Sequence, residues 1–295
     1  MTKRSAATPN GFAVVDKDTG WTSHDVVARA RKHFDTRKVG HSGTLDPSAT
    51  GVLVLGVGRA TKLLRFVTAL PKRYHATFQL GVETTTLDAD GEVTERRDVG
   101  DVGLEQINGV LESFVGQIQQ VPPMVSAVKI DGRRLHELAR EGKEVDRPAR
   151  TVTVHELTVT PAEEPNTFAM DVSCSSGTYV RSIAADIGSA VGTGAHVRTL
   201  RRNAVGSFVE AKALPVDQAV LISMADGLRD YAASTVNGEV ALAVRNGRVL
   251  ACDVLGVSGA GPWAVHSDEG ALLAVYELRD DSRAKPAVVV APASD

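Results

Sequence analysis

A glycine-rich stretch at residues 40–51, GHSGTLDPSATG, constrains this chain more than any other part of it. Its three glycines allow backbone conformations that are closed to other residues. Pro47 fixes its own φ and pushes Asp46 towards an extended geometry. The run that follows, residues 52–55, is apolar on both faces, as a buried strand would be. We therefore expect Asp46 on a stiff turn beside the core, either as a structural Asp-Pro turn or as a carboxylate held for chemistry.

Positive charge is concentrated in the same part of the chain. The net charge is −3, but residues 1–75 carry 13 Lys and Arg against 5 Asp and Glu, whereas residues 76–121 carry 2 against 9. A cationic face on a protein of low overall charge favours binding of a folded polyanion. The alternative is a solvated basic helix face without a binding role.

Length and composition indicate two domains and no membrane span. A chain of 295 residues suits two domains. We expect a disordered tail at residues 1–10, a main domain at 11–235 and a small β-rich domain at 236–295, where glycines space short apolar runs. The sequence shows no apolar run long enough to cross a membrane and no secretory N-terminus. Cys174 and Cys252 lack the spacing of a metal site or a disulfide framework, so the expected location is the cytoplasm.

Apolar periodicity predicts an α+β protein with a mostly antiparallel sheet. Strands are expected at residues 12–15, 52–57, 74–82, 152–161 and 167–174, and helices at 26–34, 60–69, 104–114, 179–191 and 216–224. Thr22 and Asp25 have the spacing of a capping box for the first helix. Thr178 is the expected N-cap of the helix that begins near Tyr179.

Two further segments interrupt this pattern. Residues 87–91, LDADG, resemble the opening of a calcium loop but lack its later ligands, so we interpret them as a turn. Residues 122–148 lie between proline breakers and are dense in Lys and Arg. Because phosphate contacts position a nucleic acid without reading its sequence, we expect this insertion to clamp RNA.

Five motifs follow one another along the chain. They are GHSGTLDP at 40–47, KRY at 72–74, SAVK at 126–129, CSSGTYVR at 174–181 and GAHVRTLRR at 194–202. In this order and spacing they resemble the TruB family of bacterial tRNA pseudouridine-55 synthases, closely over residues 11–205. The C-terminal part resembles a PUA-type RNA-binding domain. The chain departs from the family pattern at Asp18, where the family usually has Pro, and at Val125, where it usually has Tyr.

The resemblance implies a pseudouridine-synthase-like fold, with a mixed, mostly antiparallel central sheet flanked by helices and a PUA-like domain. It also implies isomerisation of uridine to pseudouridine at position 55 in the T-arm loop of tRNA, with the base flipped out. The reaction breaks the N1–C1′ bond and joins C5 to C1′ without redox change, so no cofactor and no metal are expected. The expected partner is the tRNA T stem-loop, with no membrane, and the expected state is a monomer.

The resemblance also assigns roles to residues. Asp46 is the catalytic group, as a nucleophile or as a base for the ribose, and Arg181 beside it favours its ionised form. Tyr74 stacks on the flipped pyrimidine, Tyr179 and Leu200 line the pocket, and His41 helps to hold the flipped nucleotide. The residues expected to contact RNA are Lys17, Lys129, Arg133, Arg134, Arg140, Arg201 and Arg202.

Two other functional classes compete with this interpretation. A tRNA-binding or RNA-folding protein would need no acid facing phosphate-rich RNA, so Asp46, Tyr74 and Arg181 argue against it. A phosphohydrolase with a carboxylate nucleophile would need magnesium ligands, and Asp88 and Asp90 are the candidates for these. Taken singly, each site residue also has an ordinary structural interpretation.

Overall fold

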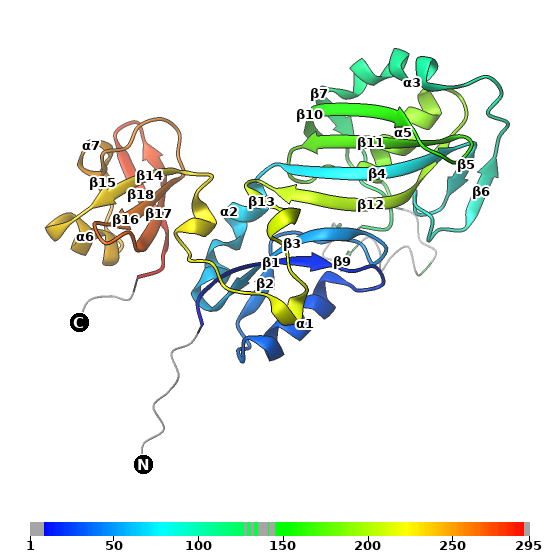
Figure 1. Ribbon diagram of the computed structural model, residues 1–295. Coiled ribbons are helices and arrows are strands. Elements are labelled where there is room, and N and C mark those ends of the chain that lie inside the picture. Colours follow the sequence, from blue (N-terminus) through cyan, green and yellow to red (C-terminus); the bar gives the residue numbers. More distant parts are fainter. Residues whose placement is uncertain (1–8, 127–128, 131–132, 135–140, 142–144, 292–295) are drawn as a thin grey trace.

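The computed structural model describes residues 9–126, 129–130, 133–134, 141 and 145–291. Figure 1 shows a large sheet in the body of the molecule and a small sheet near the C-terminus. Most of the tail expected at residues 1–10 lies outside the described residues. No helix in the described part of the chain is long and apolar enough to cross a membrane.

The large sheet has nine strands, and seven of them form one continuous path. In order across the sheet these are β1 (Gly11–Lys17), β3 (Thr50–Val57), β12 (Ala195–Val205), β4 (Lys72–Leu80), β11 (Thr167–Cys174), β10 (Arg150–Pro161) and β7 (Gly116–Gln120). β2 (Val39–His41) pairs with β3, and β13 (Phe208–Val209) pairs with β12. β3 and β12 run parallel, whereas the other neighbours on the path are antiparallel. The predicted mixed, mostly antiparallel α+β fold is confirmed.

The pairing of β3 with β12 depends on Gly51. This glycine has φ +100°, and a Cβ built on it would lie 2.3 Å from the carbonyl oxygen of Arg202. Any other residue would push the two strands apart. Because β3 follows the glycine-rich stretch and β12 carries Leu200 and Arg202, this close approach joins two of the predicted site motifs.

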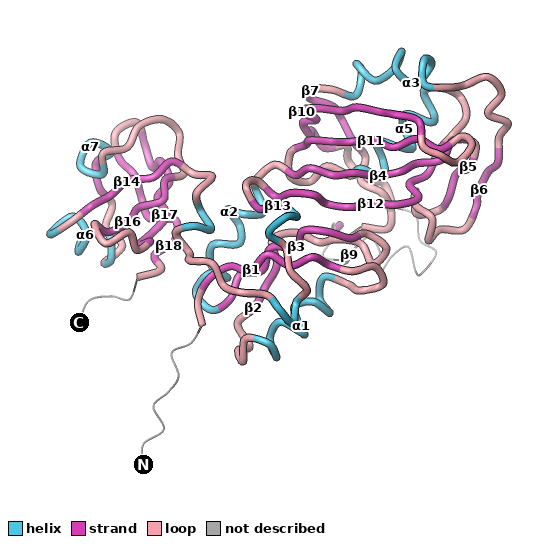
Figure 2. The backbone as a smooth tube through the Cα atoms, viewed as in Figure 1, coloured by secondary structure: helices cyan, strands magenta, loops and turns pink. Residues whose placement is uncertain are grey.

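Helices cover the large sheet in two places. α5 (Val180–Ala190) and α3 (Leu104–Leu111) bury Ile183 and Ile107 against β4, β10 and β12, and Figure 2 shows these strands running side by side in front of α5. α1 (Ser23–His33) begins at the predicted Thr22 capping box and packs near β2. Tyr74 and Leu200 pack against two separate core clusters, one that contains Phe78 and Ile183 and one that contains Val26 and Leu53. They therefore lie where these two clusters meet.

The remaining elements of the main body are short. They are α2 (Leu64–Ala69), β5 (Val82–Thr84), β6 (Val93–Arg96), β8 (Lys129–Ile130), β9 (Arg133–Arg134) and 3-10 turns at Gly58–Leu63, Glu112–Phe114, Glu210–Lys212, Val216–Gln218 and Asp226–Leu228.

Two local predictions are wrong. Residues 216–224 form one 3-10 turn and then an extended segment, because Ile222 and Phe12 exchange backbone hydrogen bonds of 2.8 and 3.0 Å. This pairing with β1 outweighs a weak helical pattern. Thr178 does not cap α5, since its hydroxyl donates to the Ser175 carbonyl at 3.0 Å and the N-cap position falls on Tyr179.

The small sheet contains β14 (Ala232–Val236), β16 (Trp263–Ser267), β17 (Leu272–Asp280), β18 (Arg283–Val289) and β15 (Leu250–Ala251), in that order, with α6 (Gly238–Arg245) and α7 (Cys252–Leu255). Its first strand begins at Ala232, slightly before the expected boundary at 236. The sheet shares a core cluster with the main body, which includes Leu272 and Val275. It lies beside α2 (Figure 1), where Arg65 and Glu277 form an ion pair of 2.9 Å.

Candidate active site

The acid turn, which we define as residues 42–49, carries Asp46 between β2 and β3. Leu45 and Ala49, on either side of Asp46, are buried. The Ser23 hydroxyl accepts from the Leu45 N–H at 2.9 Å and lies 3.1 Å from the Leu45 carbonyl oxygen, to which it donates. The Ala49 N–H donates to the Asp46 carbonyl at 3.1 Å. Asp46 is therefore held in place by contacts on both sides.

Lys17 supports the acid turn from inside the protein. Its side chain is almost fully buried, and Nζ donates to the carbonyls of Trp21 at 2.7 Å, Asp18 at 3.0 Å and Pro47 at 3.2 Å. Burial lowers the pKa of Lys17 to about 8, and the Asp46 carboxylate opposes that fall. Although the sequence suggested an RNA contact, the Lys17 ammonium group faces the protein interior.

Arg202 supports the same turn from β12. It is 2% exposed, and Nε donates to the Val52 carbonyl at 2.7 Å. Its two terminal nitrogens donate to the carbonyls of Gly43 at 3.2 Å and Thr44 at 3.4 Å. Arg202 was, like Lys17, expected to contact RNA. Its guanidinium binds backbone carbonyls at the base of the acid turn, and Arg202 also lines a cavity beside Asp46.

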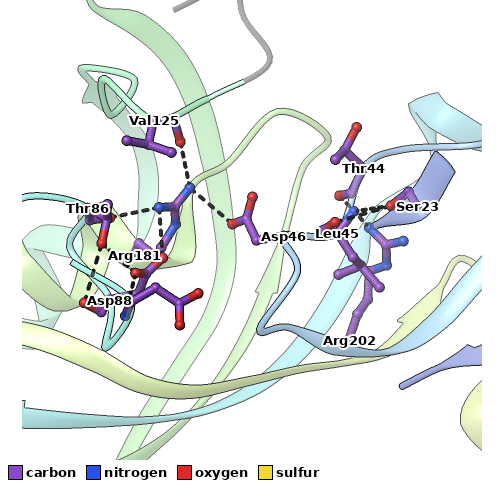
Figure 3. A network of polar contacts seen from close by, with 10 residues as sticks. Ser23, Thr44, Leu45, Asp46, Thr86, Asp88, Val125, Arg181 and Arg202 are labelled. Atoms are coloured by element: carbon purple, nitrogen blue, oxygen red, sulfur yellow. Dashed lines mark hydrogen bonds and ion pairs between the residues drawn. The ribbon is translucent and has the colours of Figure 1, made fainter. Parts of the chain in front are cut away.

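Arg181 lies in the first turn of α5 and contacts four acceptors. Nη1 donates to the Thr86 carbonyl at 2.7 Å and to Asp88 Oδ2 at 2.9 Å. Nη2 donates to the Val125 carbonyl at 2.9 Å and lies 3.0 Å from Asp46 Oδ2. Figure 3 shows the guanidinium between the two carboxylates. Val125 contributes its backbone carbonyl, so its departure from the family pattern leaves this contact intact.

The charges around Asp46 act in opposite directions. Burial raises the pKa of Asp46, the Arg181 guanidinium opposes that rise, Asp88 adds to it and Lys17 opposes it. The side chain keeps 36% of its surface exposed, whereas that of Arg181 keeps 5%. Burial outweighs the cations, so the pKa of Asp46 lies above its usual value. Arg181 and Lys17 limit that rise, and the carboxylate keeps an accessible face.

A cavity of about 270 Å³ opens beside Asp46. Tyr74 from β4, Leu200 from β12 and Tyr179 from the start of α5 line it, together with Arg181. The structure thus brings together five of the residues to which the resemblance assigned a role in chemistry or substrate binding. Burial raises the pKa of the Tyr74 hydroxyl above its usual value near 10, so this group is a neutral phenol at physiological pH.

Two residues that support the cavity were missed in the sequence. Gln120 is 3% exposed, and its amide accepts from the Tyr179 N–H at 2.7 Å and donates to the Tyr179 carbonyl at 2.9 Å. Asp88 was interpreted as part of an ordinary turn, yet its carboxylate is buried against Arg181. The acid-rich LDADG turn was a usable signal for Asp88, whereas nothing in the sequence distinguishes Gln120.

His41 and Arg201 are not among the described residues that line the cavity. His41 ends β2, where its ring meets His24 edge to face with the centroids 5.5 Å apart. Burial lowers the pKa of His41, and His24 adds to that effect, which favours the neutral ring. Arg201 forms ion pairs with Asp16 at 2.9 Å and with Glu210 at 3.0 Å.

The expected RNA clamp at residues 122–148 is described only in part. Arg133 forms an ion pair with Glu141. For Lys129 and Arg134 the structure gives the backbone alone, in the antiparallel pair of β8 and β9. Arg140 lies outside the described residues.

Comparison with known proteins identifies the family. The model described as TruB family pseudouridylate synthase (N terminal domain) matches residues 31–180, which is half of the chain. The chain belongs to the TruB family. A second model, tRNA pseudouridylate synthase B C-terminal domain, matches residues 181–230. The contact between Asp46 and Arg181 therefore joins residues from the two matched parts of this TruB-family chain.

Curated relatives match over nearly the full length of the chain. A tRNA pseudouridine synthase B of Thermobifida fusca (strain YX) is 43% identical over 290 residues, covering 96% of this chain and 99% of the relative. The protein of the same name from Mycobacterium tuberculosis (strain ATCC 25618 / H37Rv) is 41% identical over 299 residues, covering 98% of each.

Solved structures share the fold of this TruB-family chain. A chain from the crystal structure of a Cbf5-Nop10-Gar1 complex superposes with a TM-score of 0.74 at 26% identity, covering 96% of this chain and 85% of that one. A chain from the structure of an H/ACA RNP bound to a substrate RNA containing 2'-deoxyuridine has a TM-score of 0.71 at 23% identity, covering 96% and 86%.

Proposed function

We propose that this protein isomerises uridine to pseudouridine at position 55 in the T-arm loop of tRNA, with Asp46 as the catalytic group. The observation that carries the proposal is the Asp46 carboxylate, 3.0 Å from the buried Arg181 guanidinium at the wall of a cavity that also presents Tyr74. Relatives named tRNA pseudouridine synthase B support the substrate class. A monomeric state and a cytoplasmic location are part of the proposal.

The reaction needs an oxyanion close to the ribose. Breaking the N1–C1′ bond leaves C1′ electron-poor, and the Asp46 carboxylate can attack it or remove a ribose proton. Arg181 favours the ionised form of this carboxylate against the effect of burial. It also orients the carboxylate, because its guanidinium is itself fixed by Asp88 and by two backbone carbonyls. Isomerisation then needs rotation of the freed uracil and formation of the C5–C1′ bond, which returns Asp46 to its starting state. The proton on C5 is released and N1 takes up a proton, while Tyr74 supplies a flat contact surface for the base.

The cavity suits one extruded base. Its volume of about 270 Å³ corresponds to roughly nine water molecules, which fits a single base better than two. A uridine inside a folded RNA cannot be reached without leaving the stack. Tyr74 and Leu200 provide an apolar wall that replaces part of the lost base stacking.

The geometry disfavours a magnesium-dependent phosphohydrolase. Asp88 and Asp90 would have to bind the ion, yet Asp88 Oδ2 contacts Arg181 at 2.9 Å and Oδ1 accepts from the Asp90 N–H at 3.1 Å. A guanidinium beside the carboxylate also repels a cation. Among the residues that the structure describes, no three His, Cys, Asp or Glu side chains are grouped to hold a metal.

Replacement of Asp46 tests the proposal. Asp46→Asn is nearly isosteric, so the turn and the RNA affinity should change little, while the charge needed for glycosidic cleavage is lost. Tritium release from C5-labelled uridine in tRNA should fall to background, with filter-binding affinity within a few-fold of wild type. Asp18→Asn, at an exposed acid near the same turn, is the control and should keep wild-type turnover. Asp46→Asn turnover within about tenfold of wild type, or ~1.4 kcal/mol of barrier, would show that another group is essential.

A further inference from the structure

Trp21 is an exposed aromatic residue that the proposed reaction does not yet use. It is one of two tryptophans in the chain and is 40% exposed, whereas Trp263 is 2% exposed in the small sheet. Among the residues that the structure describes, no other Phe, Tyr or Trp side chain is as exposed.

The backbone around Trp21 is fastened to the acid turn. Lys17 Nζ donates both to the Trp21 carbonyl at 2.7 Å and to the Pro47 carbonyl at 3.2 Å, so a single ammonium group joins the two segments. The Gly20 N–H donates to the Pro47 carbonyl at 2.8 Å. The Trp21 backbone is therefore held beside Pro47, the residue that follows Asp46.

We propose that Trp21 is a stacking surface for an unpaired base of the substrate RNA, next to the cavity that takes the target uridine. This proposal rests on the proposed function. An RNA loop that loses one base into a cavity leaves neighbouring bases unstacked, and proteins recognise such bases by stacking them on aromatic side chains. The fixed backbone means that little freedom is lost when the base binds, so the contact contributes to affinity rather than to chemistry.

Trp21 also has an ordinary structural interpretation. It precedes the N-cap residue Thr22 of α1, which is the position of a hydrophobic staple against the helix. Leu and Trp can both serve as a staple, whereas only an aromatic ring can stack on a base. Trp21→Leu and Trp21→Phe therefore distinguish the two roles.

The test uses the full chain, a tRNA T stem-loop RNA and three readouts. RNA should quench wild-type tryptophan fluorescence and shield it from acrylamide, whereas Trp21→Phe, which keeps only the buried Trp263, should show neither change. Trp21→Ala and Trp21→Leu should raise the Kd about 5- to 50-fold and raise KM similarly, with kcat within about twofold. Trp21→Phe should stay within about threefold of the wild-type Kd, because a ring is retained. Val220→Ala, at an exposed apolar residue beyond the far end of α1, is the control and should bind as wild type does.

The outcomes separate the two proposals. If wild-type protein binds the RNA and releases tritium but its fluorescence is unchanged, the stacking role is refuted and the proposed function stands. The same holds if Trp21→Leu binds as tightly as wild type. If melting temperature falls in Trp21→Ala but RNA affinity does not, Trp21 is only a staple. If wild-type protein does not bind the RNA at all, both proposals fail.

Discussion

Asp88→Asn perturbs the arginine that contacts the Asp46 carboxylate. Arg181 contacts Asp88 Oδ2 at 2.9 Å on one side and Asp46 Oδ2 at 3.0 Å on the other. Replacing the Asp88 carboxylate by an amide removes one of its two charged partners. Arg181 keeps the Thr86 and Val125 carbonyls, so its side chain should shift towards Asp46 rather than leave the site.

The structure sets the direction of three separate effects, on stability, on kcat and on the pKa of Asp46. Removing one partner of a buried ion pair costs about 3–5 kcal/mol, but the acceptors that remain should bring the loss of stability to about 1–3 kcal/mol. A displacement of Asp46 of the order of 1 Å should lower kcat about 100-fold. The substitution also acts on the protonation of Asp46. The Asp88 charge raises the pKa of Asp46, so removing that charge lowers the pKa. A carboxylate with a lower pKa stays ionised in more acidic solution, and the acid limb of the pH–rate profile should move to lower pH.

Tritium release across the acid range measures the turnover rate and the acid limb, and urea unfolding measures the change in stability. The matched control is Asp90→Asn, because Asp90 is exposed on the same turn and contributes less than Asp88 to the pKa of Asp46. Its kcat should stay within about twofold of wild type. A folded Asp88→Asn protein with wild-type kcat and an unmoved acid limb would refute the view that Asp88 positions Arg181.

Two further predictions concern the supports of the site. Lys17→Met removes a cation that lowers the pKa of Asp46, so the acid limb should move to higher pH, the opposite of Asp88→Asn. Burial lowers the pKa of Lys17 to about 8, so between pH 8 and 10.5 the unfolded chain binds more protons than the folded one. The free energy of unfolding of the wild type, measured in urea, should therefore rise relative to that of Lys17→Met as pH increases through this range. A chain cut after Tyr231 keeps every residue that lines the cavity, so kcat at saturating RNA should stay within about threefold of wild type while KM rises. The cut also removes the shared core near Leu272, so the melting temperature should fall. Wild-type melting and wild-type KM in the cut chain would contradict this division of roles.

The predictable part of the molecule is the part that local chemistry specifies. The Thr22–Asp25 capping box, the stiff turn at Asp46 and the buried strand after Gly51 follow from side-chain and backbone preferences over a few residues, and the structure has all three. The adjacency of Asp46 and Arg181 came from the resemblance, because their positions in the sequence say nothing about distance.

Charge was the least reliable signal. Lys17 and Arg202 were both expected to contact RNA, yet both point inwards and bind carbonyls that are far away in the sequence. A count of cations cannot tell a phosphate contact from a support for a turn, since both satisfy the same N–H donors. From the sequence, Asp88 likewise had the appearance of a surface turn residue. The structure shows that its carboxylate contacts Arg181, which α5 places against it.

The insertion of β12 between β3 and β4 bears on how the enzyme is made. The contact of Arg201 with Thr50 spans 151 residues, so at about 5–20 residues per second a growing chain waits roughly 8–30 s between making the acid turn and making its supports on β12. During that interval β4 and the Thr50–Gly51 end of β3 each present an open edge, and open edges can pair with the wrong strand. A chain released before Ala195 is therefore expected to aggregate and to lack activity. The active site is completed only when β12 has been synthesised.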